Sequence, residues 1–172
     1  MHIGDADFQL IRILITSRID PKYFVGYDNW QTLADIPAQP SIALYFSTAT
    51  AFSLGERHFC IFPEPTYVWG SLLRVWNRYA PEHMRHDRHA IPTSLENHVS
   101  VMACKLRHAY LHFPAYVQKG FRGWCIYQID ADPLLAQQLT SLAAFAQYAG
   151  IGYKTTMGMG QVRVAFDAGP GS

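Results

Sequence analysis

From residue 41 onward the chain alternates two kinds of apolar segment, and their order is the strongest constraint on its fold. Four segments rich in β-branched and aromatic residues predict strands, and two segments with one apolar face predict helices. Their order is strand, helix, strand, strand, helix, strand, the βαββαβ order of an α+β, ferredoxin-like (RRM-like) domain. The expected strands are Ser41–Thr48, His98–His112, Phe121–Asp130 and Gln161–Phe166, and the expected helices are Thr66–Tyr79 and Asp132–Gly150.

Both helices have recognisable end signals. Thr66 is a good N-cap and Pro81 stops the first helix, whereas Asp132-Pro133 starts the second helix and Gly150 ends it. Each helix is expected to bury one stripe of side chains. The stripes are Val68, Leu72, Trp76 and Tyr79 in the first helix, and Leu135, Leu139, Leu142 and Ala146 in the second.

The segments before residue 41 fit the domain less well. Phe8–Ile15 predicts a strand, and Asp28 with Gln31 predicts a capping box for a short helix that ends before Pro37. A lone strand cannot bury two faces, so it either joins the main sheet or is left from a preceding domain, and we favour the second. The expected division is 1–40 as the remnant of a first ferredoxin-like domain, 41–167 as a C-terminal one, and 168–172 as a flexible tail.

Two connections are predicted to be irregular. The stretch from Ala51 through Gly55 to Pro65 is rich in breakers and predicts a loop, and Pro114–Gly120 predicts an extended, mobile loop at the end of a β-hairpin.

Charge and cysteine content narrow the functional class. Fourteen Lys and Arg oppose 13 Asp and Glu, for a net charge of +1, so nucleic-acid binding would require a local basic patch. The three cysteines form no CxxC motif, which is typical of reduced thiols in a cytoplasmic protein. No signal segment or membrane span is expected.

The segment from Gly150 to Gly160 has the composition of a phosphate-binding loop. Glycines allow positive φ and close approach of a ligand, so successive amides could cradle phosphate oxygens while Lys154 supplies charge. Alternatively, the glycines only cap a helix and turn the chain into a strand. The segment follows a helix and precedes a strand, so it is not a Walker A loop. The candidate ligands are Gly150, Gly152, Tyr153, Lys154, Thr155, Thr156, Gly158 and Gly160.

GIGYKTTMGMGQV resembles the C-terminal glycine-rich loop of the CRISPR RNA-processing endoribonucleases of the RAMP superfamily, the Cas-six family. Four further stretches are similar to that family in the right order, so that the resemblance covers residues 42 to 166. They are FSTATAF at Phe46–Phe52, FPEPTYVWGSLLRVWN at Phe62–Asn77, Lys105-Leu106-Arg107 and Gly120-Phe121-Arg122-Gly123-Trp124. Ala49 stands where the family usually has proline.

The resemblance implies recognition of CRISPR repeat RNA and metal-independent cleavage in antiviral defence: a ribose 2′-hydroxyl attacks the adjacent phosphate. It implies no cofactor and no bound metal. Members normally have two ferredoxin-like domains with the catalytic histidine early in the first, so we expect this chain to supply the RNA-binding half. The catalytic residues are therefore unassigned, and His2 is expected to belong to a disordered terminus.

Basic and aromatic side chains outside the loop extend the predicted RNA surface. Tyr153 is expected to be exposed and able to stack on a base, whereas Phe121 is expected to pack in the core. Arg74 and Arg78 share a helix face and are expected to be solvated. The cations expected to form one basic surface are Arg107, His108, Lys119, Arg122, Lys154 and Arg163, with Lys154 and Arg122 ranked first.

Several alternatives stay open. The chain could be a non-catalytic RNA-binding module or a subunit of a CRISPR interference complex, and a partner chain or a second copy in a homodimer could supply the other half. His83, His86 and His89, with His98, His108 and His112 beyond, also suggest a metal site, although this stretch looks like an irregular loop.

Overall fold

A computed structural model describes residues 2–3, 6–7, 28–56 and 58–166 of the chain. Its main sheet has four strands in the order β6-β7-β3-β8, with every neighbouring pair antiparallel. Numbered along the domain, this order is 2-3-1-4, the ferredoxin-like arrangement that the segment order predicted. The strands are β3 (Ser41–Thr50), β6 (Val99–Phe113), β7 (Tyr116–Ile129) and β8 (Val162–Phe166).

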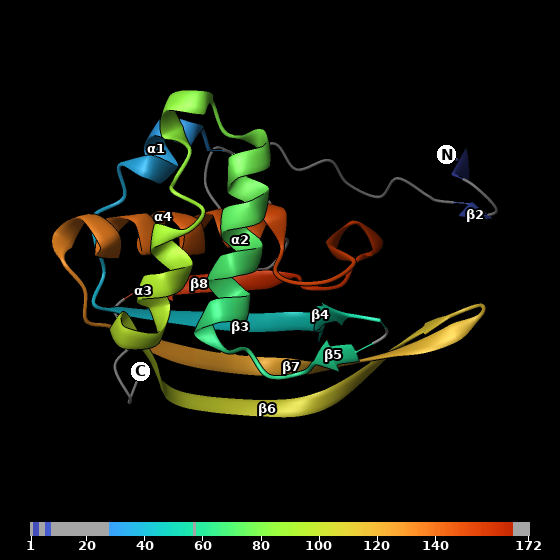
Figure 1. Ribbon diagram of the computed structural model, residues 1–172. Helices are drawn as coiled ribbons and strands as arrows, with labels where there is room; N and C mark the ends of the chain where they lie inside the picture. The colour runs from blue at the N-terminus through green and yellow to red at the C-terminus, as the bar shows by residue number, and fades with distance from the viewer. Residues whose placement is uncertain (1, 4–5, 8–27, 57, 167–172) are drawn as a thin grey trace.

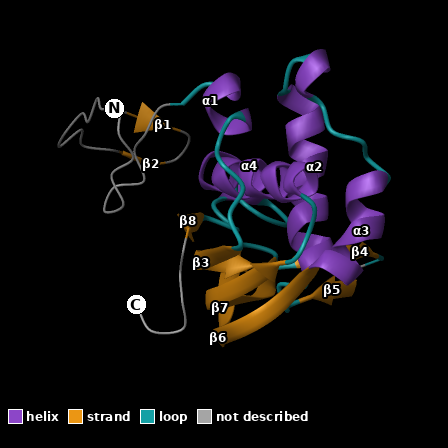
Figure 2. Cartoon of the chain, turned by 90° about the vertical axis from the view of Figure 1, so that its left-hand side faces the viewer, coloured by secondary structure: helices purple, strands orange, loops and turns teal. Residues whose placement is uncertain are grey.

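The helices lie on one side of this sheet, as Figures 1 and 2 show. The helices α2 (Pro65–Tyr79) and α4 (Pro133–Ala149) contact each other above it, and α1 (Trp30–Ala34) and α3 (Ala90–His98) flank them. Between β3 and α2 the chain adds a small hairpin of β4 (Phe52–Gly55) and β5 (His58–Cys60). None of the helices in the described part of the chain is long and apolar enough to cross a membrane.

Large side chains from α2 and the sheet fill the core between the two layers. Trp69, Trp76 and Tyr127 are fully buried. The Trp69 Nε1–H donates to the Leu139 carbonyl at 3.0 Å, and the Tyr127 hydroxyl donates to the Pro63 carbonyl at 2.7 Å. These bonds satisfy polar groups that would otherwise destabilise the core.

The ends of α4 agree with the sequence prediction, but those of α2 differ. The Asp132 carboxylate accepts hydrogen bonds from the amides of Leu134 and Leu135, and Gly150 ends α4. By contrast, α2 begins at Pro65 after the N-cap residue Glu64, so Thr66 is not the cap. Proline replaces the side-chain cap because its ring presets φ at the first helical position.

The predicted buried stripe of α2 is wrong at one residue. Val68, Leu72 and Trp76 are fully buried, but the side chain of Tyr79 is 63% exposed. Tyr79 is the last residue of the helix, and this end of α2 lies farther from the sheet than its start (Figure 1).

The predicted capping box before α1 is also wrong. Asn29 is the N-cap, and its side chain accepts a hydrogen bond from the Thr32 amide at 2.9 Å. Asp28 instead accepts a bond from the Asn29 amide, one position too early to cap the helix. The helix ends at Ala34, before Pro37 as expected.

The two predicted loops are largely regular structure. The first contains β4 and β5, and in the second only Pro114 and Ala115 separate β6 from β7. The strands continue to the tip because their side chains pair across the ladder: the rings of Phe113 and Tyr116, opposite each other, lie 4.9 Å apart.

The sequence also missed α3. Pro92 lies in the first turn of α3, where a helix needs no amide donor, so this proline does not interrupt the helix. Toward the N-terminus, β1 (His2–Ile3) pairs with β2 (Ala6–Asp7), so His2 lies in a strand and not in a disordered terminus. The strand predicted at 8–15 lies outside the described residues.

Candidate nucleic-acid interface

The glycine-rich segment packs against the end of β3. It turns through the short 3₁₀ helix η2 (Thr155–Met157) between α4 and β8. The Tyr153 amide donates to the Ala51 carbonyl at 2.8 Å, and the Gly160 amide donates to the Ala49 carbonyl at 3.0 Å. The loop is therefore held in one place by β3, not only by the two elements that it connects.

Two glycines allow this close packing. Gly152 has φ +92°, and a Cβ there would lie 2.5 Å from the Ala51 oxygen. Gly160 has φ +69°, and its Cβ would lie 2.0 Å from the Ile151 oxygen. Both distances are shorter than van der Waals contact, so these glycines serve the fold of the loop.

The same hydrogen bonds limit which amides a ligand can use. Most amides of the segment donate within the protein, to the carbonyls of β3, α4 or the loop itself. The amides that have no hydrogen-bond acceptor among the described residues are those of Gly152, Lys154, Thr155 and Thr156. The predicted phosphate cradle is thus reduced to the tip of the loop.

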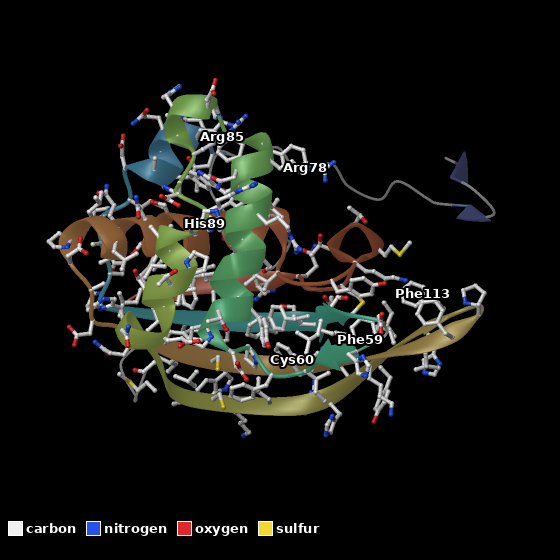
Figure 3. All side chains as sticks on the ribbon, in the orientation of Figure 1. Phe59, Cys60, Arg78, Arg85, His89 and Phe113 are labelled. Atoms are coloured by element: carbon white, nitrogen blue, oxygen red, sulfur yellow. The ribbon has the colours of Figure 1, made fainter. Side chains whose placement is uncertain are left out.

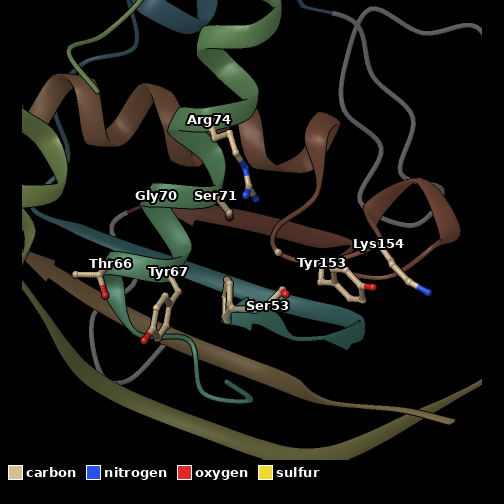
Figure 4. Close-up of a pocket in the computed structure, with 10 residues that line it drawn as sticks. Ser53, Thr66, Tyr67, Gly70, Ser71, Arg74, Tyr153 and Lys154 are labelled. Carbon is tan, nitrogen blue, oxygen red and sulfur yellow. The ribbon is translucent and has the colours of Figure 1, made fainter. Parts of the chain in front are cut away.

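A cavity of about 410 Å³ separates the loop from α2. Figure 4 shows Arg74 and Ser71 on the helix side and Tyr153 on the loop side. Thr66, Tyr67 and Gly70 of α2, Phe52 and Ser53 of β4, and Gly152 and Lys154 complete its wall. The cavity therefore joins two segments that the family resemblance had indicated separately.

The arginines of α2 extend this surface along the helix. Arg74 and Arg78 are exposed, as predicted, and line a second hollow of about 440 Å³ together with Thr155 and Thr156. Arg88 lines a third hollow, of about 540 Å³, with the same two arginines. Because α2 contains no acidic residue, this face is positively charged. The sequence alone predicted only that Arg74 and Arg78 are solvated. Their spacing on a helix without carboxylates was the feature that could have indicated a positively charged face.

Lys154 does not project freely into solvent. Its Nζ lies 4.6 Å from the ring centroid of Phe113, 4.5 Å from that of Tyr116 and 5.3 Å from that of Tyr153. Phe113 lies near the tip of the β6–β7 hairpin (Figure 3). A cation within about 6 Å of an aromatic face is attracted to it, so Lys154 connects the loop to the hairpin tip.

The predicted single basic surface is divided between the two faces of the hairpin. Arg107 is directly opposite Arg122, whereas Lys119 is opposite Tyr110. Side chains alternate between the two faces along a strand, and Arg107 and Tyr110 are three positions apart, so they lie on different faces. Lys119 therefore does not lie with Arg107 and Arg122.

The two aromatic candidates have different environments. Phe121 is buried beside Phe46, with ring centroids 4.9 Å apart, which confirms its expected place in the core. Tyr153 is only half-buried and its ring lies 5.2 Å from that of Phe59. Tyr153 thus keeps part of its ring accessible at the cavity.

The histidines between α2 and α3 do not form a cluster. No group of three or more metal-ligating side chains occurs within the described ranges. His86 stacks on Trp76 with ring centroids 5.3 Å apart, and burial lowers its pKa from the ordinary value. The arrangement assigns His86 to packing.

A ferredoxin-like domain with a glycine-rich loop between its last helix and last strand defines a RAMP-type protein. The family model of the CRISPR-associated endoribonuclease Cas6 matches residues 44–162, and the chain belongs to this family.

Known relatives agree with this assignment. A CRISPR-associated endoribonuclease Cas6 of Streptococcus thermophilus is 23% identical over 126 residues, which is 73% of this chain and 51% of the relative. A solved Cas6 product complex is 26% identical with a TM-score of 0.83, covering 94% of this chain and 64% of that one. A Thermus thermophilus Cas6 is 25% identical with a TM-score of 0.75, covering 83% of this chain and 60% of that one. The chain thus spans about half the length of the curated relative.

Proposed function

We propose that this chain binds CRISPR repeat RNA and takes part in the maturation of precursor CRISPR RNA. The binding surface is the tip of the glycine-rich loop together with the arginine face of α2. One observation carries the proposal: Arg74 and the loop, far apart in sequence, line one cavity. Family membership and the likeness to a Cas6 solved as a product complex support it.

The chemistry of the surface suits an RNA backbone. Arginine guanidinium groups bind phosphate through charge-assisted hydrogen bonds, and the threonine hydroxyls and free amides at the loop tip add neutral donors. Such contacts hold RNA in register without reading its sequence. The half-buried ring of Tyr153, on the same cavity wall, offers a base a stacking surface.

We assign this chain the RNA-binding part of the reaction. The residues lining the cavity between α2 and the loop include no histidine to act as a general base. Cleavage by the 2′-hydroxyl belongs to the proposal for the whole protein, and its base and acid are not assigned to the described residues. Assembly with other CRISPR proteins, or as a homodimer, is part of the same proposal.

A binding assay with a labelled CRISPR repeat RNA tests the proposal. Arg74→Gln combined with Arg78→Gln should weaken binding and reduce the slope of log K against log salt by about 1.4 to 1.8, because each lost phosphate contact removes about 0.7 to 0.9. Gly158→Val should weaken binding through the loop tip.

Arg85→Gln provides the matched control for charge. Arg85 lies beyond the end of α2 (Figure 3), and its guanidinium contacts the Ala80 carbonyl instead of the cavity. This variant should bind like the unmodified protein. Equal binding by all variants, or none by the unmodified chain, would refute the proposal, and a denaturing gel of the same samples shows whether the chain cleaves.

A further inference from the structure

The face of the main sheet that points away from the helices carries a group of aromatic and basic side chains, separate from those around the cavity beside α2. Figures 1 and 2 show that no described helix covers this face. The flanking residues Leu44 and Phe46 point into the core and are buried, whereas Tyr45 between them is 41% exposed. Residues directly opposite each other on neighbouring strands share a face, so the register identifies the row that contains Tyr45. From β8 to β6, that row is Arg163, Tyr45, Trp124 and Lys105.

The adjacent row keeps this face flat. It consists, in the same strand order, of Ala165, Ala43, Ile126 and Ala103. Three of these four side chains are a single methyl group. The ring of Tyr45 therefore has mostly short side chains as neighbours on that side. Trp124 is only partly buried beside the same residues.

Positive charge borders the aromatic pair on the other side. Arg107 and Arg122 lie opposite each other two positions beyond Lys105 and Trp124, and alternation puts them on the same face. All three cations are exposed. The four strands of the main sheet contain no Asp or Glu, so nothing in them neutralises this charge.

We propose that this sheet face binds single-stranded RNA, with Tyr45 and Trp124 stacking on bases while Lys105, Arg107 and Arg122 contact phosphates. The inference rests on the proposed function for the class of ligand, and it adds a surface separate from the cavity beside α2. Aromatic rings on an open sheet, flanked by cations, are the arrangement with which proteins hold unpaired nucleotides. Excess positive charge without carboxylates selects a polyanion over an apolar protein partner.

The experiment titrates the full chain with a labelled oligouridylate of about ten nucleotides, a length within the range that one such domain covers. Tyr45→Thr and Trp124→Leu should each weaken binding about tenfold, the order expected for one lost stack. Tyr45→Phe, which keeps the ring, should bind normally. Lys105→Gln should lower the salt slope by about 0.7, as expected for one contact to a single strand.

Tyr110→Thr is the matched control, because Tyr110 is 57% exposed and lies on the other face of the β6–β7 hairpin. It should bind oligouridylate like the unmodified chain. Circular dichroism of each variant identifies any that fails to fold, and Tyr45→Phe and Lys105→Gln keep the test decisive in that case.

The possible failures are distinguishable. If the unmodified chain binds repeat RNA but not oligouridylate, the sheet-face inference is wrong and the proposed function stands. If oligouridylate binds and Tyr45→Thr abolishes it, while repeat RNA binds no better than any other RNA, the inference stands and the proposed function fails. If Tyr45→Thr leaves RNA binding unchanged but dissociates an oligomer in sedimentation, the face is a protein interface and the inference is overturned.

Discussion

At the scale of single residues, glycines of the same loop have different structural roles. Gly160 and Gly158 both have positive φ, but only at Gly160 would a Cβ collide with backbone, 2.0 Å from the Ile151 oxygen. At Gly158 no heavy atom lies within 4 Å of the Cβ position. An alanine at either position would lose stability because of the left-handed backbone conformation. At Gly160 the steric collision would add to this loss.

Gly160→Ala is therefore expected to destabilise the protein by about 3 kcal/mol or more, whereas Gly158→Ala should cost about 1 kcal/mol from the left-handed backbone alone. Urea denaturation of the two variants measures both values. Similar losses at the two positions would contradict the packing of the loop against its own backbone.

The aromatic contacts of Lys154 make a second prediction at this scale. The coupling between Lys154 and Tyr116 in a double-mutant cycle, with Lys154→Met and Tyr116→Leu, should be about 0.5 to 1 kcal/mol, the usual size of a cation–π contact near the surface. The same cycle with the exposed Lys119→Met in place of Lys154→Met should give no coupling. Zero coupling in the Lys154 cycle would show that the rings do not hold this side chain, which would then be available to bind phosphate.

At the scale of elements, the link between α2 and α3 depends on a neutral histidine. His86 stacks on Trp76, and its backbone amide and carbonyl both bond to the side chain of Asn77. The His86 Nε2 is buried and has no hydrogen-bond partner. Burial lowers the pKa of His86 below the ordinary value of 6.5, so the unfolded chain binds this proton more readily than the folded one.

Stability should therefore fall as the pH drops through about 6.5 toward the lower pKa of the folded state, and this loss should be absent above that range, where both states are neutral. His86→Phe keeps a ring on Trp76 and removes the titration. Thermal unfolding across this pH range should show a smaller acid sensitivity in the variant, and an unchanged sensitivity would assign the effect to other groups.

Hairpin β6–β7 shows why element boundaries were harder to predict than element types. Period-two patterning identified both strands, but Pro114 and Gly120 suggested a long loop between them. In the structure the ladder runs on to Phe113 and Tyr116 because ring pairing and the Lys154 contact stabilise the tip. The Lys154 contact comes from a distant segment, and the ring pairing forms only once the strands are in register, so local propensity did not contain either of them.

At the scale of the whole molecule, Cys125 reports on the integrity of the core. It is fully buried on β7, and burial raises the pKa of its thiol to about 12. Only the thiolate reacts with alkylating agents, and reaching it requires the helices to separate from the sheet.

In a variant that keeps Cys125 but carries Cys60→Ser and Cys104→Ser, iodoacetamide at neutral pH should label the folded protein negligibly and the urea-unfolded protein completely. Mass spectrometry measures the label. Restoring the exposed Cys104 should restore rapid labelling of the folded state. Rapid labelling of Cys125 without denaturant would contradict a single cooperative core.

The sequence by itself determined the order of the main elements, the ends of α4 and the glycine-rich segment, because caps, breakers and periodicity act over a few neighbouring residues. Only the tertiary structure decided which distant residues meet. Packing of α2 beside the loop brought Arg74 to the cavity, the register of β6 on β7 separated Lys119 from Arg107, and the hairpin tip surrounded Lys154 with rings. These outcomes depend on long-range packing and strand register, which no local pattern encodes.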